Sequence, residues 1–427
     1  MRIIRIGICV LVTFGVLAFG AVESWSESVL QIGAALLFVW WGLLMATGRG
    51  EQIRWSPVIW PLLGLEFIAL LQFLVPLSVY PYLTKLELLR MTSYFILLFL
   101  SGQAFRTPRQ WRNFAWFIVL LGFTVAVFAV LQDLTFNGKL YWFREMRYGG
   151  MPYGPYVNRN HFAGLMELLV PMGLAMLAVP GVRRQQMPLM ALLAAMPVGA
   201  LLLSASRGGI IGFGCEVIVL VILLWIRRGE KKHLFTFLVA LLLAGGLVGW
   251  LGVEQVIQRF SQIHNPEVTE GRRISMALGA YRIFRDHPWI GSGLGTMVSV
   301  YPAYETAYDA TIVDHVHDDH FELLAETGVP GALCWLTFII LLAVYGLKNV
   351  SAHQDPVVRS VQLGTIVGCV GLLVHSFVDF NLHIPSNALL FLLEAGLATS
   401  RTPSKRQTSR FGKRAENDPL VIMKEPA

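Results

Sequence analysis

Long apolar stretches recur along the whole 427-residue chain, and they constrain its fold more than any other feature. A helix of about 20 apolar residues crosses the ~30 Å hydrocarbon core of a bilayer. Only 14% of the residues are charged, against about 25% in an average soluble domain. The stretches predict about twelve membrane-spanning helices, near residues 5–22, 29–47, 57–77, 88–102, 113–131, 161–180, 187–203, 209–226, 234–252, 331–347, 359–376 and 387–400. The expected fold is therefore an all-α polytopic membrane protein.

The lysines and arginines predict the orientation of these spans, because cytoplasmic loops carry an excess of them. With the N-terminus in the cytoplasm, the inside segments hold 22 of the 34 basic residues. These segments are 1–5, 48–56, 103–112, 181–186, 227–233, 348–359 and 401–427. Both termini are thus expected in the cytoplasm, and the net charge of +7 reflects topology instead of nucleic-acid binding.

The first 24 residues allow a second interpretation. They combine a basic start with an apolar run, and Ala18-Phe19-Gly20 fits the small-residue pattern of a signal-peptide cleavage site. Cleavage there would remove the first span and leave every later orientation unchanged.

The expected spans divide the chain into four parts. Residues 1–252 hold the first nine spans, and residues 331–400 hold the last three. Between them, residues 253–330 form a long outside loop with short amphipathic helices, and residues 401–427 form a basic, disordered cytoplasmic tail. A second long outside segment, 133–160, faces the same side. Chemistry is expected in such segments, because binding and catalytic residues concentrate on loops held by a scaffold.

Arginines near the outer ends of spans are candidates for binding an anion. Arg207 lies between two apolar stretches in LLLSASRGGIIGFG, where a guanidinium costs a few kcal/mol unless an anion or water meets it. It either extends to lipid headgroups or binds an anion beside glycines that leave space for a ligand. Arg272 and Arg273 begin a stretch of helical periodicity, so they are expected at a helix N-terminus, where free N–H groups favour an anion. That helix also carries Arg282 and Arg285 and is expected to lie flat on the membrane surface.

The stretch HVHDDHFELLAETGVPG, residues 315–331, concentrates ionisable side chains in an otherwise apolar chain. Asp319 and Glu322 have the spacing of a capping box, which predicts a short helix that ends at Gly328. His317 would then lie on irregular chain just outside the helix N-terminus. A neutral imidazole in that position can take a proton from a hydroxyl.

The same stretch allows a metal site on His315, His317 and His320. No cysteine and no HExxH pattern supports it, so we expect no metal, and His315 and His320 are also explained as satisfied loop histidines. Further polar side chains on the same predicted side are candidates for supporting His317: Asp318, Glu326, His315, Asp379 and Asn160.

These motifs resemble the bacterial O-antigen ligase and O-antigen polymerase superfamily of multi-span glycosyltransferases. The ligase pattern of His, a small polar residue, nine positions and Gly-x-x-Gly is matched by His317, Asp318 and GVPG at 328–331. The wider form HxHNDYLxLLAETG is also close, with departures at Asp318, His320 and Phe321.

Other segments resemble the superfamily as well, namely SRGG, HPWIGSGLG, NRNHFA and HSFVDFN. The resemblance therefore runs from about residue 158 to residue 383. In the superfamily a tryptophan usually lies four residues after the arginine that corresponds to Arg273, but this chain has Ala277 there. The resemblance at Arg273 is therefore weaker.

The resemblance implies a GT-C-like enzyme of the bacterial inner membrane with its site on the periplasmic side. It would move a glycan from undecaprenyl diphosphate to an acceptor hydroxyl, in surface polysaccharide or lipopolysaccharide biosynthesis. By likeness to the ligases, His317 would activate the acceptor, and Arg207, Arg273 and the neighbouring Arg272 would hold the diphosphate. No metal or other cofactor is implied.

Two sets of alternatives remain open at the level of sequence. The acceptor could be a glycan, a lipid A–core or a protein hydroxyl, so a chain polymerase and a protein O-oligosaccharyltransferase use the same donor. A transporter of the lipid-linked glycan would also explain many spans and an intramembrane arginine.

Overall fold

The computed structural model describes residues 1–146, 150–179, 184–226, 241–246, 248–250, 270–306, 312–352 and 355–400. These residues are helical, apart from loops with isolated β-bridges, as the sequence predicts. The helices are α1 (Arg2–Leu17), α2 (Ser24–Ala46), α3 (Ile59–Leu74), α4 (Pro81–Ala104), α5 (Pro108–Leu134), α6 (Arg159–Ala178), α7 (Met187–Leu203), α8 (Arg207–Ile226), α11 (Glu270–Asp286), α12 (Met297–Val300), α13 (Asp319–Ala352), α14 (Pro356–His375) and α15 (Pro385–Thr399). Short 3₁₀ turns lie at η1 (Phe19–Ala21), η2 (Arg184–Gln186), η4 (Tyr301–Ala303) and η5 (Asn381–His383).

The expected spans coincide with helices, but their number is not confirmed. Within the described residues, six helices are long and apolar enough to cross a membrane: α2, α5, α6, α8, α13 and α14. The other coinciding helices are α1, α3, α7 and α15, of 15 to 17 residues, and α4. At ~1.5 Å per residue the short ones reach about 22–26 Å, less than a ~30 Å core. The helix α4 carries Lys85, Glu87 and Arg90 in its first half. The span expected at 234–252 falls mostly outside the described residues.

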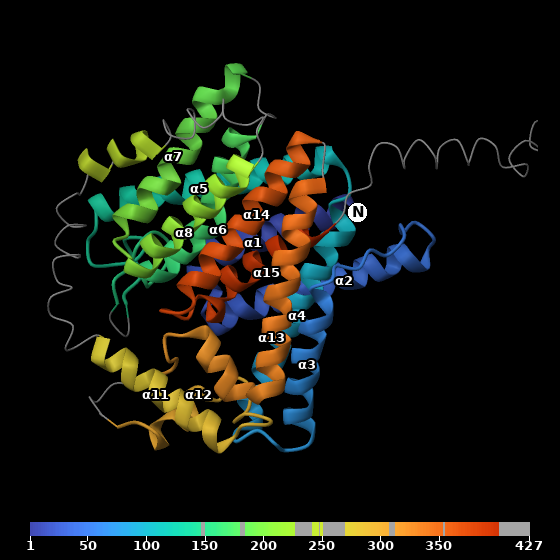
Figure 1. The fold of residues 1–427 in the computed structure, drawn as a ribbon, viewed down its shortest axis with the longest axis vertical. Coiled ribbons are helices and arrows are strands. Elements are labelled where there is room, and N and C mark those ends of the chain that lie inside the picture. Colours follow the sequence, from blue (N-terminus) through green and yellow to red (C-terminus); the bar gives the residue numbers. More distant parts are fainter. Residues whose placement is uncertain are drawn as a thin grey trace, which may run out of the picture.

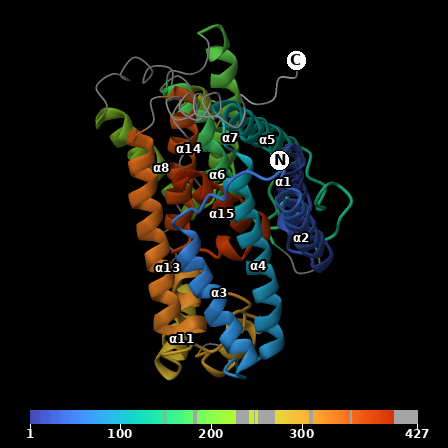
Figure 2. The ribbon, with the colours of Figure 1, turned by 90° about the vertical axis from the view of Figure 1, so that its right-hand side faces the viewer.

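Different segments of the chain lie at the two ends of the bundle. Figure 1 shows α11 and α12 together at one end, and Figure 2 shows α3, α4 and α13 running side by side toward them. At the opposite end, Arg5 donates to the carbonyl of Ala104 at 3.0 Å, and the Arg54 N–H donates to Gln103 at 3.0 Å. Three segments expected on one membrane face, 1–5, 48–56 and 103–112, therefore meet at a single end of the bundle.

The centre of the bundle is the packing of α14 against α6. Every described side chain of α6 from His161 to Ala178 is buried. The helices approach closely because α14 has glycine at position 364, where a Cβ would lie 2.8 Å from the Cα of Met172. This pair supports the loop after α14, which carries Asp379.

The amphipathic helix expected from Arg273 is confirmed as α11, which begins three residues earlier. Met276, Ala280 and Ile283 on one face are buried in a small cluster that includes Val316, the neighbour of His317. Ile274 is 62% exposed on another face. An apolar side chain exposed there fits a helix that lies at a membrane surface.

The helix α13 begins as the sequence predicts but is capped differently. Asp318 Oδ1 accepts the N–H groups of His320 and Phe321, at 3.0 Å each, so Asp318 is the N-cap. The capping box expected from Asp319 and Glu322 is wrong, because both carboxylates turn away to bond histidines. The predicted break at Gly328 is present as a kink, with φ of 67°. α13 therefore consists of two helical stretches that meet at this kink.

Candidate active site

His317 is held in an unusual backbone conformation at the entrance to α13. Its φ is +55°, in the left-handed region that non-glycine residues rarely adopt. Val316 before it is buried against α11, and Asp318 after it caps α13. Anchoring on both sides holds the strained residue, and strain of this kind is concentrated at functional sites.

The ring of His317 pairs with a buried carboxylate from a distant part of the chain. Its Nδ1 lies 3.2 Å from Oδ1 of Asp379, whose side chain is 1% exposed. Asn160 Nδ2 donates to Oδ2 of the same carboxylate at 2.6 Å, and the Phe380 N–H donates to Oδ1 at 2.9 Å. His161 Nε2 lies 3.7 Å from Oδ1. The structure therefore brings together three of the residues predicted from the sequence, and His161 of the NRNHFA segment lies beside them.

The environment keeps Asp379 ionised. Burial raises the pKa of this carboxyl, but the hydrogen bond from His317 and the electrostatic attraction of His161 and His317 outweigh burial, and the pKa falls well below its ordinary value. A carboxylate that accepts the Nδ1–H of an imidazole leaves the Nε2 lone pair free to take a proton. The side chain of His317 is 27% exposed, so the ring is partly accessible from outside.

Phe380 sits among three imidazole rings. Its ring centroid lies 4.7 Å from that of His161, 4.7 Å from that of His315 and 4.8 Å from that of His317. The phenyl ring separates the His317–Asp379 pair from a second ionic network. Nothing in the spacing of HSFVDFN indicated this role.

The second network contains the residues that had been expected to form a capping box. His383 Nδ1 lies 2.7 Å from Asp319 Oδ1, and His383 Nε2 lies 3.4 Å from Glu322 Oε1. His315 Nδ1 bonds the same Glu322 oxygen at 2.6 Å, and the Val316 N–H donates to Glu322 Oε2. Together these bonds tie the start of α13 to η5, about 60 residues later in the chain.

The charge of His383 should make the stability of the protein depend on pH. Burial alone would lower the pKa of His383, but Glu322 and Asp319 raise it to about 10. A raised pKa means that the stabilisation is complete below the unfolded value of about 6.5 and is lost as pH rises through the folded value. We expect the thermal unfolding midpoint to fall between pH 7 and pH 10.5, and to fall less steeply for His383→Gln. Equal slopes for the two proteins would contradict the ion pair.

The histidines once considered for a metal do not converge. His320 accepts from Trp335 Nε1 at 2.9 Å, and its Nε2 lies 3.1 Å from the Leu373 carbonyl oxygen, so it bonds different partners from His315 and His317. Among the described residues, His315, Glu322 and His383 have ligand-type atoms within 4.8 Å of one another. The 2.6 Å separation of His315 and Glu322 fits a hydrogen bond and is shorter than the roughly 3.3 Å between two ligands on one tetrahedral zinc.

Arg207 is the first residue of α8, next to the loop that carries Asp379. Ser206 Oγ accepts the Gly209 N–H at 3.2 Å and caps the helix. A Cβ at Gly208 would lie within 3.0 Å of His375 and Val378. These glycines therefore serve the packing of α8 against neighbouring helices, and the space predicted for a ligand beside them is filled by protein. The dipole of α8 favours an anion near its N-terminus, where Arg207 lies.

Arg273 lies in the first turn of α11, three residues before the buried Met276. Residues three apart share a helix face, so Arg273 is on the face that packs toward Val316. The side chain of Arg272 lies outside the described residues.

Glu326 holds a loop instead of facing His317. It accepts the N–H groups of Gly295 and Met297, at 2.8 Å each. Gln72, fully buried in α3, donates to the carbonyls of Ile290 and Glu326 and accepts from Leu294. Gln72 was not predicted from the sequence, although a glutamine within an apolar stretch is an available signal.

A narrow cavity of about 130 Å³ opens between α3, α4, α13 and α15. Leucine and aromatic side chains such as Leu62 and Phe391 form most of its wall. Ionisable side chains line the rest, namely Glu87, Arg90, Asp319, Glu326 and His383. The cavity therefore adjoins the second ionic network.

A further buried pair lies below Asp379. His375, at the end of α14, contacts Glu167 of α6 at 3.0 Å, and the two side chains are 1% and 0% exposed. The Asp379 N–H donates to the carbonyl of His375 at 3.1 Å. This pair therefore fixes the turn from which Asp379 extends.

Two comparisons with known proteins bear on this site. The sequence model of the O-antigen ligase family matches residues 189–336, which include Arg207, Arg273 and His317. The chain is also 25% identical, over 280 residues, to a protein named O-antigen ligase from Pseudomonas aeruginosa. That alignment covers 62% of this chain and 59% of the relative, so it spans about three fifths of the relative's length. The apolar helices and the family match together indicate a multi-pass membrane protein, and over these residues the chain is similar to the O-antigen ligases.

Proposed function

We propose that the protein is a membrane glycosyltransferase that moves a glycan from undecaprenyl diphosphate to an acceptor hydroxyl on the periplasmic side. The observation that carries this proposal is the His317–Asp379 pair, a positioned imidazole beside an ionised carboxylate, within a family of glycan ligases. Surface polysaccharide or lipopolysaccharide biosynthesis is the process it would serve.

In the proposed reaction the acceptor oxygen attacks the anomeric carbon of the donor sugar. His317 Nε2 takes the acceptor proton as the new C–O bond forms, and Asp379 stabilises the imidazolium that results. The bond from the anomeric carbon to the diphosphate oxygen breaks, and its electron pair leaves with the undecaprenyl diphosphate. Attack opposite the leaving group inverts the anomeric centre. This scheme uses no metal.

This scheme requires arginine side chains that contact the diphosphate leaving group. A diphosphate gains negative charge as it departs, and guanidinium groups stabilise such charge through paired hydrogen bonds. Arg207 and Arg273 are the proposed contacts, each in the first turn of a helix near the His317 loop. Arg272 is a third candidate.

The orientation follows from where the basic segments gather. The end of the bundle with Arg5, Arg54 and Arg106 is assigned to the cytoplasm by the positive-inside rule, and the end with α11 to the periplasm. A GT-C-like arrangement of about twelve spans in the bacterial inner membrane, with both termini cytoplasmic, is part of the proposal. The wall of leucine and aromatic side chains in the cavity beside Asp319 and His383 would contact hydrocarbon of a lipid substrate.

The acceptor separates three forms of this function. A ligase uses a lipid A–core or a similar final acceptor, a polymerase uses a growing glycan, and a protein O-oligosaccharyltransferase uses a side-chain hydroxyl. We propose ligase-like transfer because both named matches are O-antigen ligases. The length of glycan added per acceptor distinguishes a ligase from a polymerase.

Purified full-length protein in detergent provides the direct test. Incubated with undecaprenyl-diphosphate-linked glycan and an acceptor, it should form the glycosidic bond without a sealed membrane. A transporter would form no bond under these conditions and would move the labelled lipid only between the leaflets of vesicles. Failure to form the bond with any of the three acceptor classes would overturn the proposed function.

Arg207→Ala should weaken the use of donor. Loss of one charge-assisted contact costs about 1.5–3 kcal/mol, so the donor concentration for half-maximal rate should rise at least about tenfold. Arg285→Ala is the matched control, because Arg285 is exposed on α11. Unchanged donor dependence in Arg207→Ala, with normal insertion, would count against the contact.

A further inference from the structure

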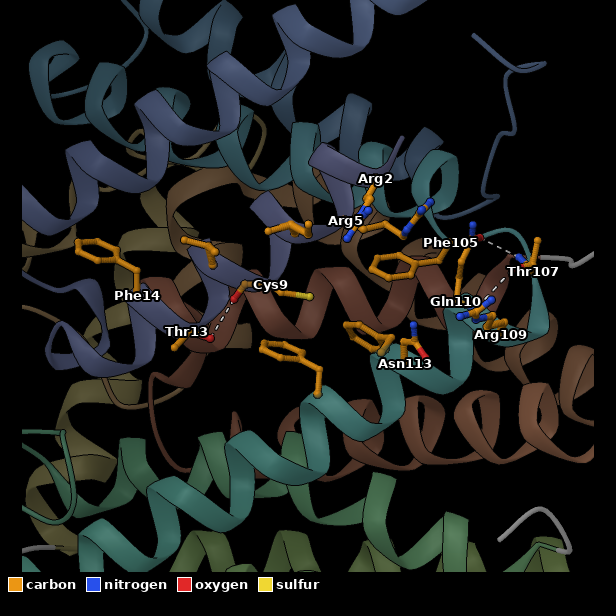
Figure 3. Close-up of a pocket in the computed structure, with 14 residues that line it drawn as sticks. Arg2, Arg5, Cys9, Thr13, Phe14, Phe105, Thr107, Arg109, Gln110 and Asn113 are labelled. Carbon is orange, nitrogen blue, oxygen red and sulfur yellow. Dashed lines mark hydrogen bonds between the residues drawn. The ribbon is translucent and has the colours of Figure 1, made fainter. Parts of the chain in front are cut away.

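A large cavity at the end of the bundle away from His317 has no part in the proposed reaction. It has a volume of about 1010 Å³ and lies between α1 and the first turns of α5, beside Phe105. Figure 3 shows Arg2, Arg5 and Arg109 toward one side of it and Thr13 and Phe14 toward the other. The helix α4 connects the two ends of the bundle. Its first residues adjoin the loop at Ser292, where the Val79 N–H donates to the Ser292 carbonyl at 2.8 Å, and its last turn adjoins the cavity. Its 24 residues separate them by about 36 Å.

The polar side of the cavity is strongly cationic. Three arginines line it, and no acidic side chain does. Arg5 donates to the Ala104 carbonyl at 3.0 Å, and the nearby Glu51 bonds Arg106 instead, at 3.0 Å. In the part of the chain that the structure describes, neither Arg2 nor Arg109 forms a salt bridge with a carboxylate.

The other side of the cavity is apolar and follows a helix into the membrane. Ile6, Val10 and Phe14 lie four residues apart on α1, on one face. Ile6 is 54% exposed and Val10 is 57% exposed. From Arg2 to Phe14 the helix rises about 18 Å, slightly more than half of a ~30 Å hydrocarbon core. The cavity therefore has arginines at one end and an apolar face about as long as one leaflet is thick. A phospholipid has the same arrangement, with a charged headgroup above its acyl chains.

We propose that this cavity is a binding site for an anionic phospholipid of the surrounding bilayer. Arg2, Arg5 and Arg109 bind its phosphate and its negatively charged headgroup, and the amide of Gln110 or Asn113 can donate to its oxygens. One acyl chain lies along Ile6, Val10 and Phe14. Basic pockets between helices on the cytoplasmic side of membrane proteins are typical headgroup sites. The lipid fills the space between α1 and α5 and thereby stabilises the position of α1.

The test compares full-length protein in nanodiscs of phosphatidylcholine with protein in nanodiscs that also contain phosphatidylglycerol. Native mass spectrometry measures which lipid stays bound, and the thermal unfolding midpoint measures stabilisation. The double variant Arg2→Gln/Arg109→Gln removes two cavity charges and leaves the Arg5 bond to Ala104 intact. The matched control Arg49→Gln/Arg112→Gln removes the same charge from exposed positions at the same end, outside the cavity.

Wild-type protein and the control should retain phosphatidylglycerol and unfold at a higher temperature in its presence. In the cavity variant, the preference for phosphatidylglycerol over phosphatidylcholine should fall at least about tenfold. Each arginine near a headgroup contributes about fivefold to the affinity for an anionic lipid. Val10→Trp, which narrows the apolar side, should reduce retention of both lipids. An equal preference in all variants would overturn the site, and displacement of the lipid by inorganic phosphate would show a free-anion site instead. Neither result depends on glycan transfer.

Discussion

Asp379→Asn is expected to reduce glycan transfer by about a thousandfold while the protein stays inserted and folded. An amide at this position cannot balance the charge of the imidazolium and can hold the ring in the wrong tautomer, which costs orders of magnitude in other acid–base pairs. His317→Ala removes the base itself and should cost about 10²–10⁴-fold. Transfer from lipid-linked donor in purified membranes, corrected for protein level, measures both.

The pair should behave as a unit. Residues that act together give non-additive losses, so the double variant His317→Ala/Asp379→Asn should be no worse than His317→Ala alone. Asp286→Asn is the control, since that carboxylate bonds Tyr304 on the surface. If the losses of transfer rate in the two single variants multiply in the double variant, His317 and Asp379 do not act as a pair.

Gly291→Ala is expected to cost about 3 kcal/mol of folding stability, the second large effect. Gly291 has a φ of +76°, and a Cβ there would lie well within 3.0 Å of the backbone of Glu326 and Thr327. Backbone atoms cannot rotate away as a side chain can. Two hydrogen bonds, from Ser292 to Ala325 and from Gly293 to Glu326, hold the loop at this spot, and the alanine would force them apart.

The Gly291→Ala substitution should also affect the candidate active site, because the loop at residues 291–293 packs against the first turns of α13. We expect a lower unfolding temperature, faster proteolysis between α11 and α13, and reduced transfer. Gly138→Ala is a matched control, since Gly138 also has a positive φ, +85°, but has open space where the Cβ would lie. That variant should lose only about 1 kcal/mol from backbone strain. Equal destabilisation in both would show that the contact with α13 is unimportant.

Local patterns in the sequence predicted the helices well. Apolar runs of a given length specify helices in a membrane, because every backbone group must bond within its own segment there. Gly328 was predicted as a break because glycine readily adopts a positive φ. The same reasoning failed for the helix cap, since Asp318 and Asp319 are both plausible caps and only their distant partners distinguish them.

The number of spans could not be predicted from apolar length alone. A short helix such as α15 can be apolar because it packs inside the bundle, and buried helices have the same composition as spanning ones. Leu389 and Leu390 of α15 illustrate this, with exposed fractions of 1% and 0%. Helix length, which the sequence places only to within a few residues, decides between the two.

The sequence alone determined that this chain is a helical membrane protein, where its basic segments lie, and that His317 carries its most distinctive motif. The tertiary structure decided that Asp379 is the partner of His317, that His383 joins Asp319, and that Glu326 holds a loop. The physical reason is range: hydrophobic runs and helix caps act over a few residues, whereas His317 and Asp379 are 62 residues apart. Which polar side chains meet across such a distance depends on how α13 and α14 pack against each other. No local sequence pattern determines the relative position of the two helices.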